Sequence, residues 1–245
     1  MLNFLNIASG SRGNSTVIWD ENDAIIIDFG ISLKRYKYIE ERFSITKNRS
    51  LFITHEHGDH SKNAKAMSKY ADVYSRQATL ESLKINGYKI NDEVAIGNFL
   101  IMALSISHDA VDPVGYIIKN RNVKISIFSD LGFVGDSLID EMKNSDLIAL
   151  EANHDLEMLT SGPYPEALKA RIKSKYGHLS NEQAAEAIQL SNNNSYIVLT
   201  HLSEKNNNPD LAYKTVYYYL KNRNSRFKSI ECASQENGSS LYTFH

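Results

Sequence analysis

The residues best suited to chemistry lie in one short segment of the chain. Three histidines and an aspartate fall within six residues there, namely His55, His57, Asp59 and His60. In an extended chain, His55 and His57 project to the same side, and Gly58 then lets the chain turn. Imidazole combined with carboxylate suits Zn, Fe or Mn better than Ca or Mg. The segment therefore predicts a metal site, with a histidine-rich surface loop as the alternative.

Further candidate ligands follow apolar, β-branched runs that predict strands. His108 comes after the run at 99–105, Asp130 after 123–128 and His201 after 196–200. Asp28 ends an earlier run, at 24–28. A single His or Asp after a strand is usually a loop residue or a cap. Several of them behind one histidine cluster favour a shared metal centre.

The elements that must position these residues follow from hydrophobic periodicity and turn residues. We expect strands at 3–8, 16–20, 24–28, 51–54, 72–74, 99–105, 114–119, 123–128, 146–151, 196–200, 229–232 and 240–244. We expect helices at 31–43, 61–70, 78–86, 136–143, 164–175, 181–190 and 210–221, and polar loops at 192–194 and 206–208. Strands precede mixed strands and helices in both halves, which predicts an α/β (α+β) fold, a four-layer αββα sandwich, as a single domain over 1–245.

Composition excludes several other classes of protein. A net charge of −2 provides no overall attraction to nucleic acid, so any such attraction must come from a local patch. The single Cys232 excludes an intrachain disulfide and a cysteine-rich metal site, and fits a reducing cytoplasm. We see no signal peptide and no apolar run long enough to span a membrane.

These residues resemble the pattern of the metallo-β-lactamase superfamily, His-x-His-x-Asp-His followed by a His, an Asp and a final His. The resemblance implies two divalent metal ions, Zn, Mn or Fe. It assigns three ligands to one ion, His55, His57 and His108, and three to the other, Asp59, His60 and His201. Asp130 would bridge the ions with a water or hydroxide as nucleophile, and Asp28 would orient the histidine loop.

Motifs outside the metal set are similar to those of the YycJ/WalJ subfamily. They lie at 8–15, 54–60, 107–110, 151–155, 177–181 and 200–203. This resemblance implies a 5′-to-3′ exonuclease acting on the DNA backbone, with a link to DNA repair, including mismatch repair, and to repair-protein partners. Arg12 and Ser15 depart from the subfamily, which often has small residues or Cys there. His201 follows Asp130 by only 71 positions, which leaves no room for the large inserted domain of RNase J-like enzymes.

A substrate phosphate site is expected near Gly177–Asn181. Ser180 fits a helix N-cap with Gln183 three residues later, and free N–H groups at a helix start bind phosphate. We therefore expect His178, Ser180 and Asn181 to bind phosphate. We also expect His178 and His154 to act beside Asp59 and Asp130 in catalysis, although a helix cap and a packed histidine are the plain alternatives.

Two basic runs could guide a nucleic-acid backbone toward the metals. One run contains Lys169, Arg171, Lys173 and Lys175, and the other Lys62, Lys65 and Lys69. Tyr164 and Tyr176 lie beside the first run and could stack on bases. Solvated helix faces and ordinary packing are the default interpretations of these residues.

Two other functions stay open from the sequence. A small-molecule hydrolase for a thioester, lactone or cyclic phosphodiester would use the same metals without the basic runs. A metal-stabilised scaffold would not need such a complete ligand set, because a structural site has little reason to keep open positions for water.

Overall fold

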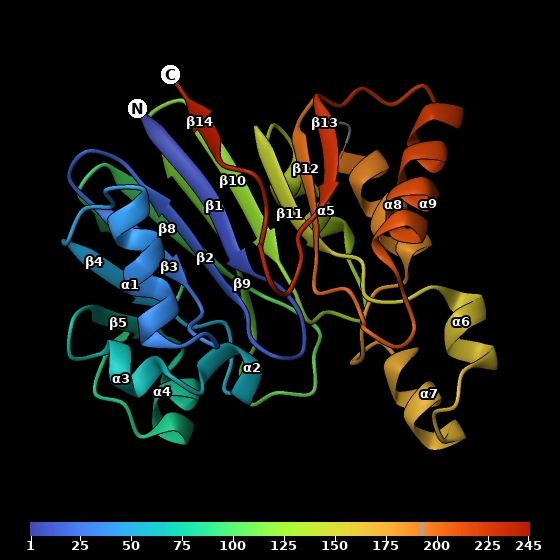
Figure 1. The fold of residues 1–245 in the computed structure, drawn as a ribbon, viewed down its shortest axis with the longest axis horizontal. Coiled ribbons are helices and arrows are strands. Elements are labelled where there is room, and N and C mark those ends of the chain that lie inside the picture. Colours follow the sequence, from blue (N-terminus) through green and yellow to red (C-terminus); the bar gives the residue numbers. More distant parts are fainter. Residues whose placement is uncertain (192–193) are drawn as a thin grey trace.

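Two β-sheets pack face to face in the computed structural model, which describes residues 1–191 and 194–245 (Figure 1). The order of the first sheet is β14-β1-β2-β3-β4-β5-β6 and that of the second is β13-β12-β11-β10-β9-β8-β7. The predicted polar loop at 192–194 lies outside the described residues at Asn192 and Asn193.

The first sheet comes mainly from the first third of the chain. Its strands are β1 (Leu2–Ala8), β2 (Ser15–Trp19), β3 (Ala24–Ile27), β4 (Arg49–Phe52), β5 (Asp72–Ser75), β6 (Tyr88–Lys89) and, from the C-terminus, β14 (Tyr242–Phe244). β3, β4 and β5 run parallel to one another. Because they are parallel, their carboxyl ends meet at one edge of the sheet.

The second sheet repeats this arrangement with later segments. Its strands are β7 (Glu93–Ile96), β8 (Phe99–Ser105), β9 (Val114–Asn120), β10 (Val123–Phe128), β11 (Leu147–Glu151), β12 (Tyr196–Thr200) and β13 (Ser229–Cys232). β9 and β10 form a hairpin, with Arg121 in the left-handed region at φ 53°. β10, β11, β12 and β13 are parallel, so their carboxyl ends also share an edge.

Helices cover the outer faces of both sheets. Beside the first sheet lie α1 (Leu33–Arg42), α2 (Gly58–Ser61), α3 (Ala64–Met67) and α4 (Gln77–Leu83). Beside the second lie α5 (Asp136–Met142), α8 (Asn181–Ser191) and α9 (Pro209–Asn222), whereas α6 (Leu156–Ser161) and α7 (Glu166–Ile172) lie lower, beyond the ends of the strands (Figure 1). The predicted four-layer αββα sandwich is confirmed.

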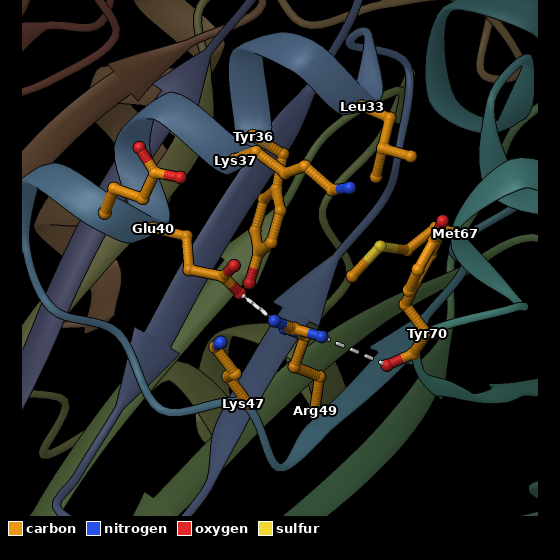
Figure 2. Close-up of a pocket in the computed structure, with 9 residues that line it drawn as sticks. Leu33, Tyr36, Lys37, Glu40, Lys47, Arg49, Met67 and Tyr70 are labelled. Atoms are coloured by element: carbon orange, nitrogen blue, oxygen red, sulfur yellow. Dashed lines mark hydrogen bonds and ion pairs between the residues drawn. The ribbon is translucent and has the colours of Figure 1, made fainter.

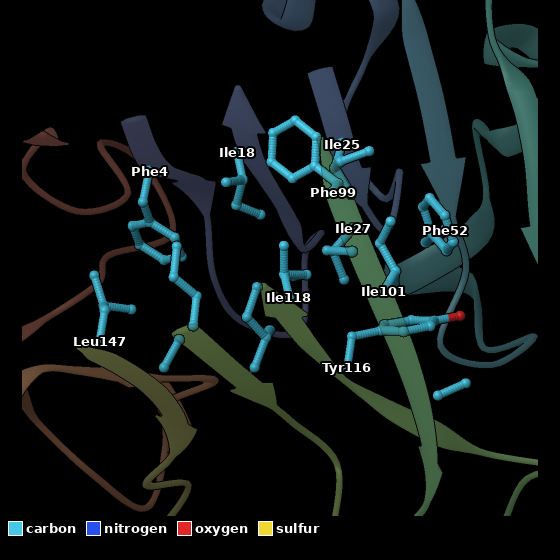
Figure 3. Packing of buried hydrophobic residues seen from close by; sticks show 14 of the residues in the cluster. Phe4, Ile18, Ile25, Ile27, Phe52, Phe99, Ile101, Tyr116, Ile118 and Leu147 are labelled. Atoms are coloured by element: carbon cyan, nitrogen blue, oxygen red, sulfur yellow. The ribbon is translucent and has the colours of Figure 1, made fainter. Parts of the chain in front are cut away.

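Three apolar clusters hold the layers together. The central one lies between the sheets and includes Phe52, whose ring stacks on Tyr74 at 4.8 Å and meets Tyr116 edge-on at 5.6 Å (Figure 3). The other two fill the spaces between each sheet and its helices. Burial of this apolar surface is the main favourable contribution to folding. The Tyr116 hydroxyl also donates to the carbonyl of Ile53 at 2.8 Å, which fixes the chain just before the histidine segment.

Polar contacts fix the ends and outer face of the helices. The Ser32 side chain caps α1 and the Asn208 side chain caps α9, where Pro209 follows at the first helical position. On the outer face of the first sheet, Glu40 of α1 accepts a hydrogen bond from Arg49 of β4, beside a small pocket (Figure 2). This contact ties the helix to the strand that leads to the histidine segment.

Several predicted boundaries change in the structure. The helix expected at 61–70 is two short helices, and the first of them already begins at Gly58. The helix expected at 164–175 shortens to Glu166–Ile172, because Pro165 is its N-cap. β6, β7 and α6 were not predicted. The expected loop at 206–208 is partly core, since Asn206 and Asn207 are buried. None of the described helices is long and apolar enough to span a lipid bilayer.

Candidate metal centre

The predicted ligands converge on one edge of the sandwich. The His55–His60 segment comes after β4, while Asp28, His108, Asp130 and His201 follow β3, β8, β10 and β12. Ligand sites of α/β sheets commonly form beyond the carboxyl ends of parallel strands. The fold therefore gathers side chains that are up to 173 positions apart, from Asp28 to His201, at one place.

One group of possible ligands consists of His55, His57 and His108. One side-chain nitrogen from each lies within 4.8 Å of the others, and Nε2 of His108 is 3.3 Å from Nδ1 of His57. Burial holds the pKa of His55 well below its ordinary value, so the ring is neutral. A neutral imidazole has a lone pair available for a metal ion.

A second group consists of Asp59, His60 and His201. Oδ2 of Asp59 lies 3.3 Å from Nε2 of His201 and 3.5 Å from Nε2 of His60. Asp130 lies between the two groups. Its Oδ2 is 2.6 Å from Nε2 of His60, and its Oδ1 is 3.9 Å from Nε2 of His108. One carboxylate therefore reaches both groups.

Neighbouring acceptors and donors fix the orientation of these imidazoles. Nδ1 of His60 lies 2.7 Å from Oδ2 of Asp28, and this carboxylate also accepts hydrogen bonds from the backbone and hydroxyl of Thr54. Nδ1 of His55 lies 2.9 Å from the Thr54 hydroxyl. In both rings Nδ1 is engaged, which directs Nε2 toward the centre. Asp28 therefore lies where its carboxylate can orient the His60 ring.

Glu151 is a buried residue that the sequence analysis did not single out. Its Oε2 lies 3.0 Å from Nδ1 of His201 and 3.2 Å from Nδ1 of His178. It also accepts backbone N–H bonds from Asp130 and Leu179. These four donors occupy its oxygens, so we assign Glu151 to the support of the centre, although its geometry also allows a metal group with Asp130, His178 and His201. The available signal was an acidic residue at the end of a buried strand, inside the motif at 151–155.

Asn14 is a second residue that was missed. Its Nδ2 lies 2.9 Å from Nε2 of His60 and 3.3 Å from Oδ2 of Asp59. Its Oδ1 accepts from the backbone of Gly10, which closes the turn between β1 and β2. That turn, quoted above at 8–15, thus contacts the second ligand group directly.

Three residues of the centre adopt a backbone conformation that is rare for non-glycine residues. Asp28, Asp130 and His201 have φ values of 60°, 54° and 53°. Asp28 and His201 come directly after strands β3 and β12, and Asp130 comes two residues after the end of β10. Such strain clusters at functional sites and persists because the surroundings hold it. Here the backbone N–H of His201 donates to Ser9 Oγ at 2.7 Å, and that of Asp130 to Glu151.

A cavity of about 440 Å³ opens onto the two groups. Ligands His57, Asp59, His108, Asp130 and His201 line it together with His178, Asn153, Tyr164, Leu168, Arg171, Ile172, Ser11 and residues 202–205. Burial alone would lower the pKa of His178, but the carboxylates of Glu151 and Asp130 raise it above its ordinary value. His178 thus lines the cavity, while its roles in phosphate binding and catalysis stay predictions.

The structure places Ser180 and Asn181 elsewhere. Both are buried and neither lines the cavity. Ser180 and Gln183 form the expected capping box, and the Asn181 amide pairs with Asn207. The backbone N–H groups of residues 178–181, 183 and 184 already donate within the protein. Six of the seven backbone N–H groups from 178 to 184 are therefore not free for the predicted phosphate site.

His154 also lies away from the ligand groups. Its ring is buried and lines a separate cavity of about 260 Å³ with Lys173, Ser180 and Tyr219. Burial lowers its pKa to about 4, so it is neutral near pH 7. The geometry gives no support to a direct catalytic role for this residue.

The first basic run is divided by the structure. Lys169 is buried, and its ammonium donates to the Thr160 carbonyl and to Glu166, so the expectation that it faces a nucleic acid is wrong. Arg171 lies at the cavity and donates from Nε to Asp109 at 2.6 Å. Lys173 and Lys175 are exposed. A cationic surface thus remains beside the cavity, without Lys169.

Comparison with known proteins agrees with the fold and the ligand pattern. The family described as the beta-lactamase superfamily domain matches residues 25–202. The chain belongs to the metallo-β-lactamase superfamily, and it is a hydrolase of that fold with a His/Asp metal-binding centre.

Two curated relatives match most of the chain. The exodeoxyribonuclease YycJ of Bacillus anthracis is 31% identical over 238 residues, covering 91% of this chain and 90% of the relative. The exodeoxyribonuclease WalJ of Streptococcus pneumoniae is 33% identical over 232 residues, covering 87% and 86%. These matches confirm the predicted resemblance to the YycJ/WalJ subfamily.

Solved structures share the fold at lower identity. YhfI of Bacillus subtilis, a metallo-β-lactamase fold protein, has a TM-score of 0.77 at 15% identity and covers 98% of both chains. Human tRNase Z, short form, has a TM-score of 0.65 at 16% identity, also with 98% of both chains covered. Likeness at such identities shows the fold alone.

Proposed function

We propose that this protein is an exodeoxyribonuclease that hydrolyses phosphodiester bonds of DNA from the 5′ end at a centre for two divalent metal ions. The observation that carries the proposal is the position of Asp130, whose two carboxylate oxygens face separate ligand groups. The names of the two curated relatives supply the substrate class. A role in DNA repair stays a prediction from the family resemblance.

The residues present fit metal ions. In the described part of the chain, Nε2 of His55, a buried atom of the centre, has no hydrogen-bond partner. Such atoms are costly unless a ligand satisfies them. The donor set of imidazoles and carboxylates favours Zn, Mn or Fe. The two groups would each hold one ion, with Asp130 shared between them.

When bound, a pair of divalent ions lowers the pKa of water and neutralises charge on a phosphate. The chain itself contributes position and hydrogen bonding. Asp28 and Glu151 fix the tautomers of His60 and His201 by accepting from Nδ1. His178 is held at Nδ1 by Glu151, and in its protonated form it donates from Nε2 to a phosphate oxygen; the carboxylates of Glu151 and Asp130 raise its pKa and so favour that form. Arg171 adds positive charge at the rim of the cavity.

The test begins with metal-stripped protein and 5′-phosphorylated, end-labelled double-stranded DNA. Mn, Zn and Mg are added back separately, and products are followed over time. We expect metal-dependent release of mononucleotides from the 5′ end. His108→Ala removes one ligand and should abolish release while the circular dichroism spectrum stays unchanged.

The matched control is Val111→Ala, an exposed side chain on the loop that carries His108. It should retain wild-type activity. Full activity of His108→Ala would overturn the proposed centre. Failure of protein loaded with two ions to cleave any DNA would favour the small-molecule hydrolase instead.

A further inference from the structure

One wall of the metal cavity is apolar. Tyr164, Leu168 and Ile172 line it, and they are spaced four residues apart, so they share one face of α7 and of the turn that precedes it. All three are partly exposed. None belongs to the three apolar clusters that residues 1–191 and 194–245 form. This face therefore packs against no core and borders the cavity.

The apolar wall is held in place from several sides. Lys169 of α7 is buried, and its ammonium donates to the Thr160 carbonyl. Arg171 pairs with Asp109, on the loop of the ligand His108. Beyond the helix, Ser107 Oγ donates to the Lys175 carbonyl at 2.6 Å. These contacts fix α7 against the loops that carry the ligands, so the wall is formed before a substrate arrives.

The backbone at Tyr164 is restricted as well. Pro163 and Pro165 stand on either side of it. A proline fixes its own φ and disfavours helical backbone in the residue before it. Tyr164 is therefore presented from a stiff turn, and little conformational entropy is lost when a ligand packs on its ring.

The remaining walls of the cavity are polar and charged. The metal ligands and His178 line the cavity together with two cationic side chains, Arg171 and Lys205, and the acidic Glu204. Arg171 pairs with Asp109, and Glu204 pairs with Arg12. A volume of about 440 Å³ is within the usual range for a small-molecule site. A ligand with a flat apolar part joined to a phosphate matches these walls.

We propose that Tyr164, Leu168 and Ile172 form a binding site for the base of the terminal nucleotide, which places the adjoining phosphodiester at the ligand groups. This inference rests on the proposed function and deepens it. Stacking on an aromatic ring tolerates every base. The site therefore recognises the presence of a terminal base and not its identity, as a nuclease that degrades any sequence requires.

The test compares two oligonucleotides that differ only in the 5′-terminal nucleotide, which carries adenine in one and is abasic in the other. Stacking contributions of single bases predict that wild-type kcat/KM falls about 5- to 100-fold for the abasic end. Tyr164→Ala should lower kcat/KM for the natural end. The ratio of kcat/KM for the natural end to that for the abasic end should then be less than about 2-fold. Tyr164→Phe keeps the ring and should keep the ratio.

The matched control is Tyr176→Ala, which removes an exposed tyrosine of the same segment that does not line the cavity. It should keep the wild-type ratio. If wild-type protein degrades both oligonucleotides equally, the base site is wrong and the nuclease stands.

If no DNA is cleaved, the proposed nuclease function is wrong. The base site is then tested by measuring the binding of small ligands. Calorimetry with dAMP and with deoxyribose 5-phosphate should then show tighter binding of dAMP that is lost in Tyr164→Ala. Equal affinities would overturn the base site.

Discussion

Oε2 of Glu151 lies 3.0 Å from Nδ1 of His201, and Nε2 of the same ring faces Asp59 at 3.3 Å. The buried carboxylate of Glu151 thus accepts a hydrogen bond from Nδ1 of His201, a candidate metal ligand. This contact leaves Nε2 of His201 available to bind a metal ion. Carboxylates in this position raise the basicity of the histidine and fix its orientation. The same Glu151 holds His178, so one residue supports both a ligand and a cavity side chain.

Replacing Glu151 with glutamine should weaken metal binding about 10- to 100-fold, because the amide cannot accept from all the donors that surround it. A competition titration with a coloured chelator measures this affinity, and kcat/KM should fall with it. Glu186→Gln, on the exposed surface of α8, is the control. Unchanged metal affinity in Glu151→Gln would show that Glu151 serves the fold alone.

Asp28→Asn should selectively weaken the group of Asp59, His60 and His201. Asparagine tolerates the left-handed backbone at this position, so the turn is kept. The substitution replaces the carboxylate that accepts the hydrogen bond from Nδ1 of His60 with an uncharged amide. Metal content measured by mass spectrometry should drop from two ions toward one, as expected for an outer partner of a ligand. Asp72→Asn, an exposed change on β5, should keep the full content. A full metal content in Asp28→Asn would contradict this role.

The basic run offers a test of DNA against a small substrate. Arg171→Glu combined with Lys173→Glu should weaken DNA binding and reduce the slope of log K against log salt by about one for each lost phosphate contact. Lys169→Ala should instead lower the free energy of unfolding by about 1–3 kcal/mol, because it removes a buried hydrogen bond from α7. An unchanged salt slope in the double variant would favour the small-molecule hydrolase.

His154 should make stability depend on pH. Its pKa in the folded protein is lowered from 6.5 to about 4 by burial. Well above pH 6.5 the His154 ring is neutral in both the folded and the unfolded protein. Its ionisation then makes no contribution to the free energy of unfolding. Between pH 6.5 and 4 the unfolded chain binds a proton that the folded protein does not, so stability falls as pH falls.

Urea unfolding at pH 7 and pH 4.5 measures this effect. Between pH 7 and pH 4.5, the free energy of unfolding of the wild type should fall by about 2 kcal/mol more than that of His154→Gln. Each unit of pKa shift corresponds to about 1.4 kcal/mol. A parallel loss in both proteins would show that His154 does not titrate in this way.

The sequence by itself determined the layers of this fold and the identities of the predicted metal ligands. Apolar β-branched runs alternate with turns and amphipathic helices, and these local patterns suffice to predict most elements. The spacing of His55, His57, Asp59 and His60 similarly needs no distant contact to suggest a metal. Short elements such as α6 and β6 were not predicted, because so few residues carry a readable period.

Only the tertiary structure decided which residues contact the predicted metal ligands and which of the predicted site residues lie elsewhere. Glu151 contacts the ligands because parallel strands bring their carboxyl ends to one edge, and Asn14 contacts them because the turn between β1 and β2 reaches the same edge. Local spacing in the sequence encodes neither contact. The same packing buried Lys169 and consumed the backbone donors around Ser180, since every buried polar group needs a partner. The tertiary structure also placed Tyr164, in the turn before α7, at the wall of the metal cavity. The adjoining face of α7 packs against none of the described apolar clusters.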